Sequence, residues 1–264
     1  MIQIALSGFL FEDNYESQSI SFDKFCRIAH VLGYDGVELR NTQINIYTPK
    51  TEREKILEVV KNNELRVTCI TARNLPAALI ERTDAYLRYL ELCEDIECNL
   101  LKISGEIEWL RWAAEKAAER SIILGVNNHI GNPLETVIGT KNFFKQLNHP
   151  NVKLLFDPFH LMVNNENYIE CIPEFIDNII NVLMQSARLA SSYNKKDIIT
   201  IKNKSWEKVL PDEEGAQDWR KIFAKLKICK YKGLITVIEN NWPKDKREFV
   251  AKYCIDFIRK EFGI

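Results

Sequence analysis

Two acidic residues follow directly on strongly apolar runs of the chain. Asp157 ends the run KLLFD, and Glu239 ends the run LITVIE. An acid at the point where a buried strand opens to solvent could bind a divalent metal ion, bind hydroxyl groups or transfer a proton. For either acid alone, an equally good explanation is that it caps the next helix or pairs with a nearby Lys or Arg. Because two acids, and not one, stand at the ends of apolar runs, we predict a functional site that contains both.

Other polar side chains end further apolar runs. His160 comes three residues after Asp157 in DPFH, so a tight turn would let both face one ligand. Asn127 and His129 share strand parity, which directs both to the same side of an extended segment. The remaining polar residues in such positions are Glu38, Arg40, Lys102, Ser104, Thr200 and Lys202. Among all of these, the residues that we expect to contact a substrate are His129, Glu38, Arg40 and Lys102.

These residues can form one site only if the strands that carry them belong to one sheet and end at the same edge of it. Eight apolar, β-branched runs recur along the chain, and each is followed by a segment with helical periodicity. The predicted strands cover residues 2–7, 35–40, 65–71, 99–104, 122–128, 152–157, 197–202 and 233–239. The predicted helices cover residues 21–33, 51–64, 82–96, 109–120, 136–147, 172–190, 218–230 and 245–262. Alternation of buried strands with amphipathic helices implies parallel strands and right-handed crossovers.

Eight such units without a linker predict a closed (β/α)₈ TIM barrel, an α/β fold, as a single domain over residues 1–264. A doubly wound open sheet is the alternative. In a barrel the carboxyl ends of the strands form the mouth, where the active sites of this fold are built. The longest irregular stretch, residues 203–217, contains Trp206 and is predicted to be a loop that arches over the mouth.

Composition restricts the possible partners. The net charge of -1 and the pI of about 6.5 disfavour nucleic acid and anionic membranes as partners. No apolar run reaches the ~18 residues of a membrane span, and the start of the chain lacks the basic segment of a signal peptide. The seven cysteines are an odd number and mostly lie in apolar helix or strand patterns, as reduced core thiols do. We therefore expect a cytoplasmic protein.

Trp109 and Trp112, in WLRW, could mark a subunit contact in a homo-oligomer. Packing of their helix against the barrel explains these two side chains equally well.

The strings GYDGVELR, GVNNHIGNP, LLFDPFHL and DWRKIFAKLKICKYKGLITVIEN, in this order, resemble the xylose isomerase-like barrels. The resemblance is to the group of sugar phosphate isomerases and epimerases that also includes the type IV apurinic endonucleases, and it extends over nearly the whole chain. It implies a (β/α)₈ barrel, a small carbohydrate substrate and no nucleotide cofactor.

The resemblance also implies a set of metal ligands. Members of the group typically hold one divalent ion with a Glu on strand five, an Asp on strand six, a His on strand seven and a Glu on strand eight. Asp157 and Glu239 match two of these positions, whereas Asn127 stands where the first Glu is usual and Thr200 where the His is usual. These replacements remove a negative charge and a nitrogen donor, so we expect at most a loosely held Mg²⁺ or Mn²⁺ and not Zn²⁺.

The activity that the resemblance implies is proton transfer next to a ketose carbonyl. In this interpretation Glu239 is the base, and His160, Lys202 or Lys102 stabilises the oxyanion. Because Asn127 replaces the opposing acid, one-base isomerisation is favoured over two-base epimerisation. A sugar-binding or regulatory barrel without turnover is the alternative. An endonuclease acting in DNA repair fits least, since it needs more than the four His present and a basic groove.

Overall fold

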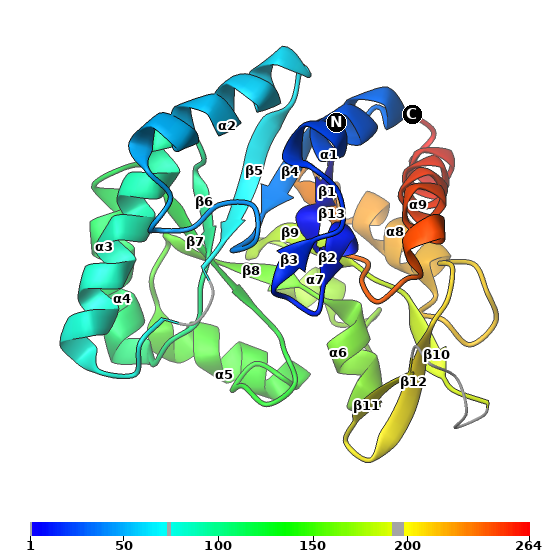
Figure 1. The fold of residues 1–264 in the computed structure, drawn as a ribbon. Helices are drawn as coiled ribbons and strands as arrows, with labels where there is room; N and C mark the ends of the chain where they lie inside the picture. Colours follow the sequence, from blue (N-terminus) through cyan, green and yellow to red (C-terminus); the bar gives the residue numbers. More distant parts are fainter. Residues whose placement is uncertain (1, 73–74, 192–197) are drawn as a thin grey trace.

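The computed structural model describes residues 2–72, 75–191 and 198–264 (Figure 1). Eight parallel strands form a closed barrel in the order β1-β13-β9-β8-β7-β6-β5-β4. Their bounds are β1 (Gln3–Ser7), β4 (Gly36–Leu39), β5 (Arg66–Thr71), β6 (Leu100–Lys102), β7 (Ile123–Asn127), β8 (Val152–Phe156), β9 (Ile179–Met184) and β13 (Leu234–Val237). The predicted (β/α)₈ fold is thereby confirmed, and the open sheet is excluded.

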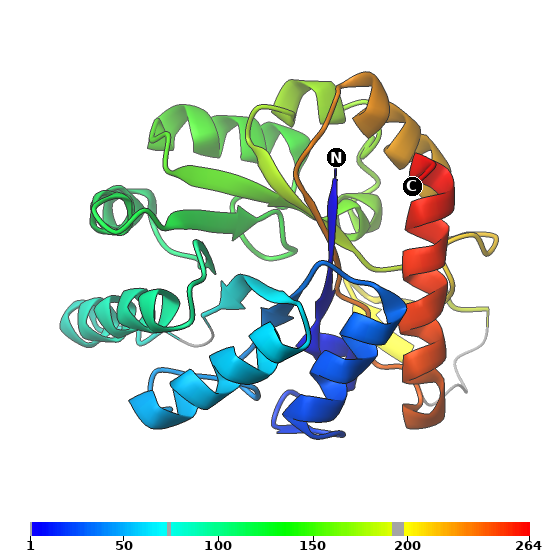
Figure 2. The same ribbon diagram turned by 90° about the horizontal axis from the view of Figure 1, so that it is seen from above.

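Helices surround the barrel, as the view from above shows (Figure 2). They are α1 (Phe22–Leu32), α2 (Lys50–Asn62), α3 (Leu79–Asp95), α4 (Ile107–Ala118), α5 (Val137–Leu147), α6 (Pro158–Val163), α7 (Ile172–Phe175), α8 (Trp219–Ile228) and α9 (Arg247–Phe262), with 3-10 turns η1 (Gly8–Phe11) and η2 (Lys244–Lys246). Helix α1 shows how sequence fixes the ends of such an element. The Ser21 hydroxyl accepts a hydrogen bond from the Lys24 amide, and Gly33 ends the helix with a φ of 82°.

The seventh barrel strand differs from the prediction. It is β9, Ile179–Met184, which pairs with β8 on one side and with β13 on the other. The prediction of a helix over residues 172–190 is therefore wrong for these residues. That segment begins with the four-residue helix α7, continues with the apolar run IINVLM of β9 and ends with a second short strand. A short apolar run has the same hydrophobic pattern in a buried strand as in a buried helix, so periodicity alone could not separate the two.

The segment that was predicted as strand seven belongs to a smaller antiparallel sheet beside the barrel (Figure 1). This sheet has the order β10 (Ala187–Leu189), β12 (Lys204–Lys208), β11 (Ile198–Ile201). Asp197, the first residue of the predicted strand, lies outside the described residues. The stretch predicted as an irregular loop thus begins with β12. A second small hairpin, β2 (Glu12–Asp13) with β3 (Ser17–Gln18), follows η1.

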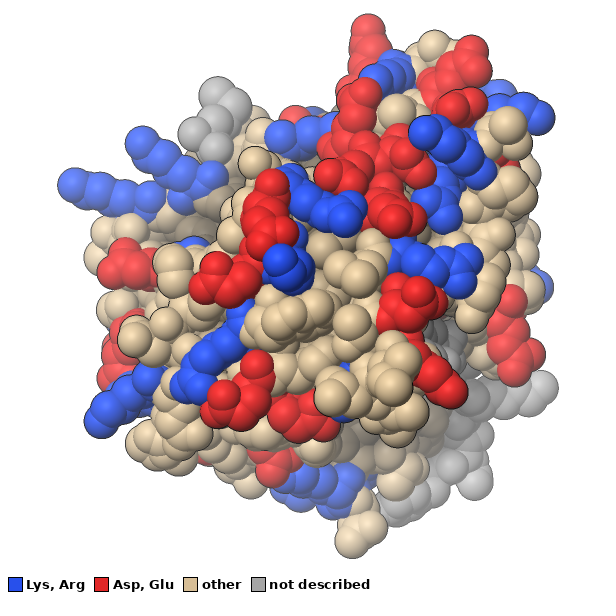
Figure 3. All heavy atoms as spheres, turned by 90° about the vertical axis from the view of Figure 1, so that its left-hand side faces the viewer, with Lys and Arg blue, Asp and Glu red and all other residues tan. Residues whose placement is uncertain are grey.

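Thiols and surface charges agree with the composition. All seven cysteines are free, and all except Cys229 are buried. On the face that carries α3 and α4, Lys and Arg alternate with Asp and Glu, so this face has no large area of one sign (Figure 3). Arg120 pairs with Glu94 there at 2.7 Å.

Among the helices described, none combines the length and the apolar character that crossing a bilayer requires.

A buried tyrosine links the two ends of the chain. Tyr34 is 4% exposed, and its hydroxyl donates to the Ala251 carbonyl at 2.6 Å. We expect Tyr34→Phe to lower the free energy of unfolding by about 1 kcal/mol, because a buried hydrogen bond is lost while the ring packing is kept. Urea unfolding measures the change. Tyr253→Phe removes an exposed hydroxyl bonded to Asp212 and should change stability less; an equal loss in both variants would contradict the prediction.

Candidate active site

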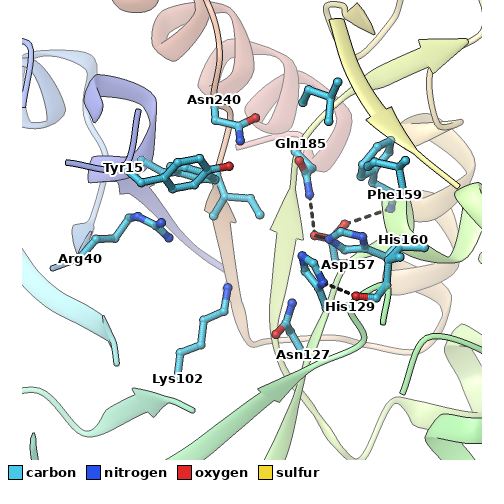
Figure 4. A pocket seen from close by; sticks show the side chains of 15 residues that line it. Tyr15, Arg40, Lys102, Asn127, His129, Asp157, Phe159, His160, Gln185 and Asn240 are labelled. Atoms are coloured by element: carbon cyan, nitrogen blue, oxygen red, sulfur yellow. Dashed lines mark hydrogen bonds and ion pairs between the residues drawn. The ribbon is translucent and has the colours of Figure 1, made fainter. Parts of the chain in front are cut away.

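A cavity of about 420 Å³ lies at the carboxyl ends of the barrel strands (Figure 4). Four of the polar side chains in its wall are cations or imidazoles, namely Arg40, Lys102, His129 and His160. The wall also includes one carboxylate and three amides, namely Asp157, Asn127, Gln185 and Asn240. In Figure 4, Arg40 and Lys102 extend toward the cavity from one side, opposite the group around Asp157. The structure therefore brings residues from six barrel strand ends, those of β4, β6, β7, β8, β9 and β13, into one polar site.

Asp157 lies at the end of β8 and is 1% exposed. Its Oδ1 accepts a hydrogen bond from the Phe159 amide at 3.0 Å, and its Oδ2 accepts one from Gln185 Nε2 at 2.7 Å. His160 Nε2 lies 3.5 Å from Oδ2. Burial raises the pKa of Asp157, while the hydrogen bond from Gln185 acts in the opposite direction. Both carboxylate oxygens are thus already bonded to protein donors.

Asn128 fixes the backbone of Asp157. Its Nδ2 donates to the Asp157 carbonyl at 2.7 Å, and its Oδ1 accepts from the Asp157 amide at 2.8 Å. The side chain is 1% exposed, so this reciprocal pair joins β7 to the turn after β8 inside the protein. The sequence analysis did not single out Asn128. Its position beside Asn127 gave no signal, since strand parity directs it away from the predicted mouth.

The two histidines of the mouth stack on each other, with ring centroids 3.9 Å apart. His129 Nδ1 is 2.8 Å from the Ile130 carbonyl oxygen, which can only accept, so Nδ1 carries the proton. In the neutral ring Nε2 then has a free lone pair. Burial lowers the pKa of His160 well below its usual value, and the neighbouring His129 and Lys102 act in the same direction. His160 is therefore neutral at physiological pH.

Glu239 is fully buried and does not line the cavity. Its Oε1 accepts from the Ser186 amide at 2.7 Å, and its Oε2 accepts from Trp242 Nε1 at 3.0 Å. Burial raises the pKa of Glu239, and the Lys208 ammonium opposes the shift. A carboxylate enclosed in this way cannot reach a substrate in the cavity, so the geometry argues against its predicted role as the base.

Lys208 lies next to the site and was not predicted from the sequence. It ends β12, and its side chain is only 2% exposed. Its Nζ lies 3.7 Å from Glu239 Oε2, donates to Gln185 Oε1 at 2.9 Å and is 5.8 Å from the centroid of the Phe159 ring. Burial lowers the pKa of Lys208, while Glu239 and Asp157 oppose that shift. The only sequence signal was a lysine set between Trp206 and Val209, which are both buried.

Two predicted site residues lie elsewhere. Thr200 is exposed on β11, and the Lys202 ammonium is bonded to Asn164 Oδ1 at 2.5 Å and to Glu135 Oε2 at 3.2 Å. Neither lines the cavity. The reason is that residues 197–202 were predicted as the seventh barrel strand, whereas that strand is β9. The residue just past the end of β9 is Gln185. The structure thus places Thr200, the predicted metal ligand, and Lys202, the predicted catalytic residue, outside the wall of this cavity.

Of the predicted substrate contacts, Arg40, Lys102 and His129 lie in the cavity wall and Glu38 does not. The Arg40 guanidinium donates to Glu12 Oε2 at 3.1 Å and stacks 3.9 Å above the Phe9 ring. Glu38 is 1% exposed, and its Oε1 accepts from the Thr71 hydroxyl at 2.5 Å. Glu38 is thus buried against β5 and lies outside the wall of this cavity.

The residues present do not fit the four-ligand metal site that the resemblance implies. The four strand ends hold Asn127, Asp157, Gln185 and Glu239, of which two are neutral amides. Within residues 2–72, 75–191 and 198–264, no three or more His, Cys, Asp and Glu form a group able to hold a metal ion. Two carboxylates whose oxygens already accept protein hydrogen bonds are a poor set for Mg²⁺ or Mn²⁺.

Comparison with known proteins agrees with the fold. A family model described as xylose isomerase-like TIM barrel matches residues 26–261. The chain belongs to this family.

Solved structures of the same fold include enzymes with different names. A probable 3-DHS dehydratase, AsbF, from Bacillus anthracis is 16% identical over 97% of this chain and 99% of its own, with a TM-score of 0.78. A D-psicose 3-epimerase is 16% identical over the whole of both chains, with a TM-score of 0.75. An AP endonuclease of family 2 from Brucella melitensis is 18% identical over 97% and 99% of the two chains, with a TM-score of 0.73. At these identities the likeness shows the fold alone.

One curated relative, an uncharacterized protein of Rickettsia bellii (strain RML369-C), is 24% identical over 261 residues. The match covers 92% of this chain but only 28% of that protein. The chain therefore spans less than a third of the length of the curated relative that it matches.

Proposed function

We propose that this protein is an acid-base enzyme of the sugar isomerase and epimerase kind, which moves a proton next to the carbonyl of a small carbohydrate. The observation that carries the proposal is the stacked His129–His160 pair, which shares the mouth cavity with the Lys102 ammonium. The family and the sugar epimerases of the same fold support the substrate class.

His129 is the base in this proposal. Its Nδ1 proton is bonded to the Ile130 carbonyl, so Nε2 is the nitrogen that can accept a proton. Nε2 removes the proton from the carbon next to the substrate carbonyl, and the electron pair moves onto the carbonyl oxygen to give an enediolate. The proton of the adjacent hydroxyl passes to the former carbonyl oxygen, and the protonated imidazole returns its proton to the former carbonyl carbon, so that an aldose becomes a ketose. One base suffices for this exchange, and the role replaces the one first predicted for Glu239.

Lys102 is the electrostatic stabiliser. Its ammonium group extends into the cavity from β6 (Figure 4), where it can face the oxygen on which negative charge develops. Arg40, Asn127 and Asn240 supply donors and acceptors for hydroxyl groups in the same wall. Ile199 and Ile201 of β11 form an apolar part of the wall. This mixture of a few polar groups with an apolar surface is common in sites for small molecules.

A panel of aldoses and ketoses incubated with the protein in D₂O tests the proposal. Proton NMR should show loss of the signal of the hydrogen next to the carbonyl for at least one sugar, and His129→Gln should abolish that loss. Absence of exchange for every sugar contradicts the proposal. If a sugar raises the thermal midpoint without any exchange, the alternative of a binding barrel without turnover is supported. The enclosure of Glu239, which matches a family ligand position, is the observation that favours this alternative.

Replacing Lys102 tests the role of its charge. We expect Lys102→Met to reduce kcat/KM by about 10²–10³-fold, mostly through kcat, because the ammonium stabilises charge that develops only in the transition state. Steady-state kinetics on the sugar found in the panel measures the effect. Lys153→Met is the matched control, since Lys153 lies on β8 outside the cavity and donates to the Asp177 carbonyl. A loss that appears only in KM would assign Lys102 to binding instead.

A further inference from the structure

We propose that the ammonium group of Lys208 takes the place of the divalent metal ion in this barrel, so that the site is assembled without a metal. The juxtaposition that carries the inference is a buried ammonium held between the two carboxylates that match the family's metal positions, Asp157 and Glu239.

The contacts form one continuous chain. Glu239 Oε2 lies 3.7 Å from Lys208 Nζ, which donates to Gln185 Oε1 at 2.9 Å. Gln185 Nε2 donates in turn to Asp157 Oδ2 at 2.7 Å. The amide can adopt only one orientation here, because an ammonium group only donates and a carboxylate only accepts. Gln185 thus joins the cation to the more distant carboxylate.

The charges of the site balance as they would with a metal ion. The ligand set that the resemblance implies, three carboxylates and a neutral imidazole around a divalent ion, carries one net negative charge. In this chain Asn127 and Gln185 are neutral, so the carboxylates of Asp157 and Glu239 with the Lys208 ammonium also leave one net negative charge. The loss of one carboxylate and the exchange of a divalent for a monovalent cation compensate each other.

The small antiparallel sheet delivers the lysine. Lys208 is paired in register with Ala187, two residues beyond Gln185 in the chain. The turn after β9 and the end of β12 are therefore held side by side by backbone hydrogen bonds, and the Phe159 ring lies 5.8 Å from the ammonium. Side-chain burial of 98% leaves the ammonium enclosed rather than tethered at the surface. The predicted loop of residues 203–217 thus supplies a built-in cation.

A metal ion would have to displace these partners. The Oε1 atom of Glu239 accepts from the Ser186 amide and Oε2 from Trp242 Nε1, while both oxygens of Asp157 also accept from protein donors. Gln185 offers Oε1, but that oxygen is bonded to Lys208. The inference rests on these contacts alone and does not depend on the activity proposed above, since it needs no substrate to be tested.

The first test uses the wild-type protein. After purification without chelator, elemental analysis should find no stoichiometric Mn²⁺, Mg²⁺ or Zn²⁺, and added MnCl₂ or EDTA should leave the thermal midpoint unchanged. Calorimetric titration with MnCl₂ should show no saturable heat. One Mn²⁺ per chain, with a thermal midpoint that falls in EDTA, would overturn the inference whatever the outcome of the sugar panel.

The second test restores space and a ligand for a metal. Lys208→Ala combined with Gln185→His should bind Mn²⁺ and gain a rise in thermal midpoint on MnCl₂ addition, because the ammonium is removed and an imidazole is added between the two carboxylates. Lys204→Ala combined with Gln185→His is the matched control, as Lys204 is exposed on the same strand, and should gain nothing. A double variant at Lys208 that folds but binds no Mn²⁺ counts against the inference; if it does not fold, the wild-type titration decides.

Discussion

Replacement of Lys208 by Met is expected to lower the free energy of unfolding by about 3–5 kcal/mol. The reason is that removal of one partner leaves a buried charge without compensation. Lys208 is 2% exposed at its side chain and Glu239 is 0% exposed, so water does not screen this pair. Gln185 Oε1 loses its donor in the same variant. Urea unfolding followed by fluorescence measures the change, provided that the slope of the transition stays constant.

The double variant Lys208→Met with Glu239→Gln separates this electrostatic effect from lost packing. Neutralising Glu239 removes the charge that Lys208 compensates, so most of the lost stability should return. Lys204→Met on the exposed face of β12 should change stability by less than about 0.5 kcal/mol. If Lys208→Met unfolds like the wild type, or if the double variant is no more stable than the single one, the ion pair does not hold the site together.

The barrel could be predicted from the sequence because each unit repeats one strong pattern. Runs such as LLF and LITV are apolar and buried on both faces, and the helices between them bury one side only. The exception was β9, because the short helix α7 and the strand after it together form an apolar stretch long enough for one helix. The apparent count of eight strands was preserved only because β11, in the small sheet, took the place of β9.

The site could be predicted only where a residue follows its strand directly. Asp157, His160 and Lys102 end or follow correctly placed strands, and the structure places all three in the cavity wall. Gln185 was missed because it follows the strand that was taken for a helix. Lys208 was missed because its position depends on the pairing of β10 with β12, which is a contact between segments about twenty residues apart and leaves no periodic signal.

Replacement of His129 by Gln is expected to reduce kcat about 10²–10⁴-fold on the sugar that the panel identifies. Gln keeps a donor near the Ile130 carbonyl but has no nitrogen lone pair with which to accept a proton, so binding should change less than turnover. Steady-state kinetics and solvent deuterium exchange measure both effects.

Variants of His149 and His160 serve as comparisons for His129→Gln. His149 lies outside the cavity, 3.1 Å from Glu115, and His149→Gln should keep full activity. His160→Phe retains the stack on His129 but removes the imidazole beside Asp157, so it tests whether that neutral ring orients His129 or also transfers a proton. A large loss of kcat in His160→Phe together with a small loss in His129→Gln would move the role of the base from His129 to His160. Full activity in His129→Gln would contradict the role of His129 as the base, because the variant has no imidazole at this position. Nε2 is the only nitrogen of His129 that could act, as Nδ1 is bonded to the Ile130 carbonyl.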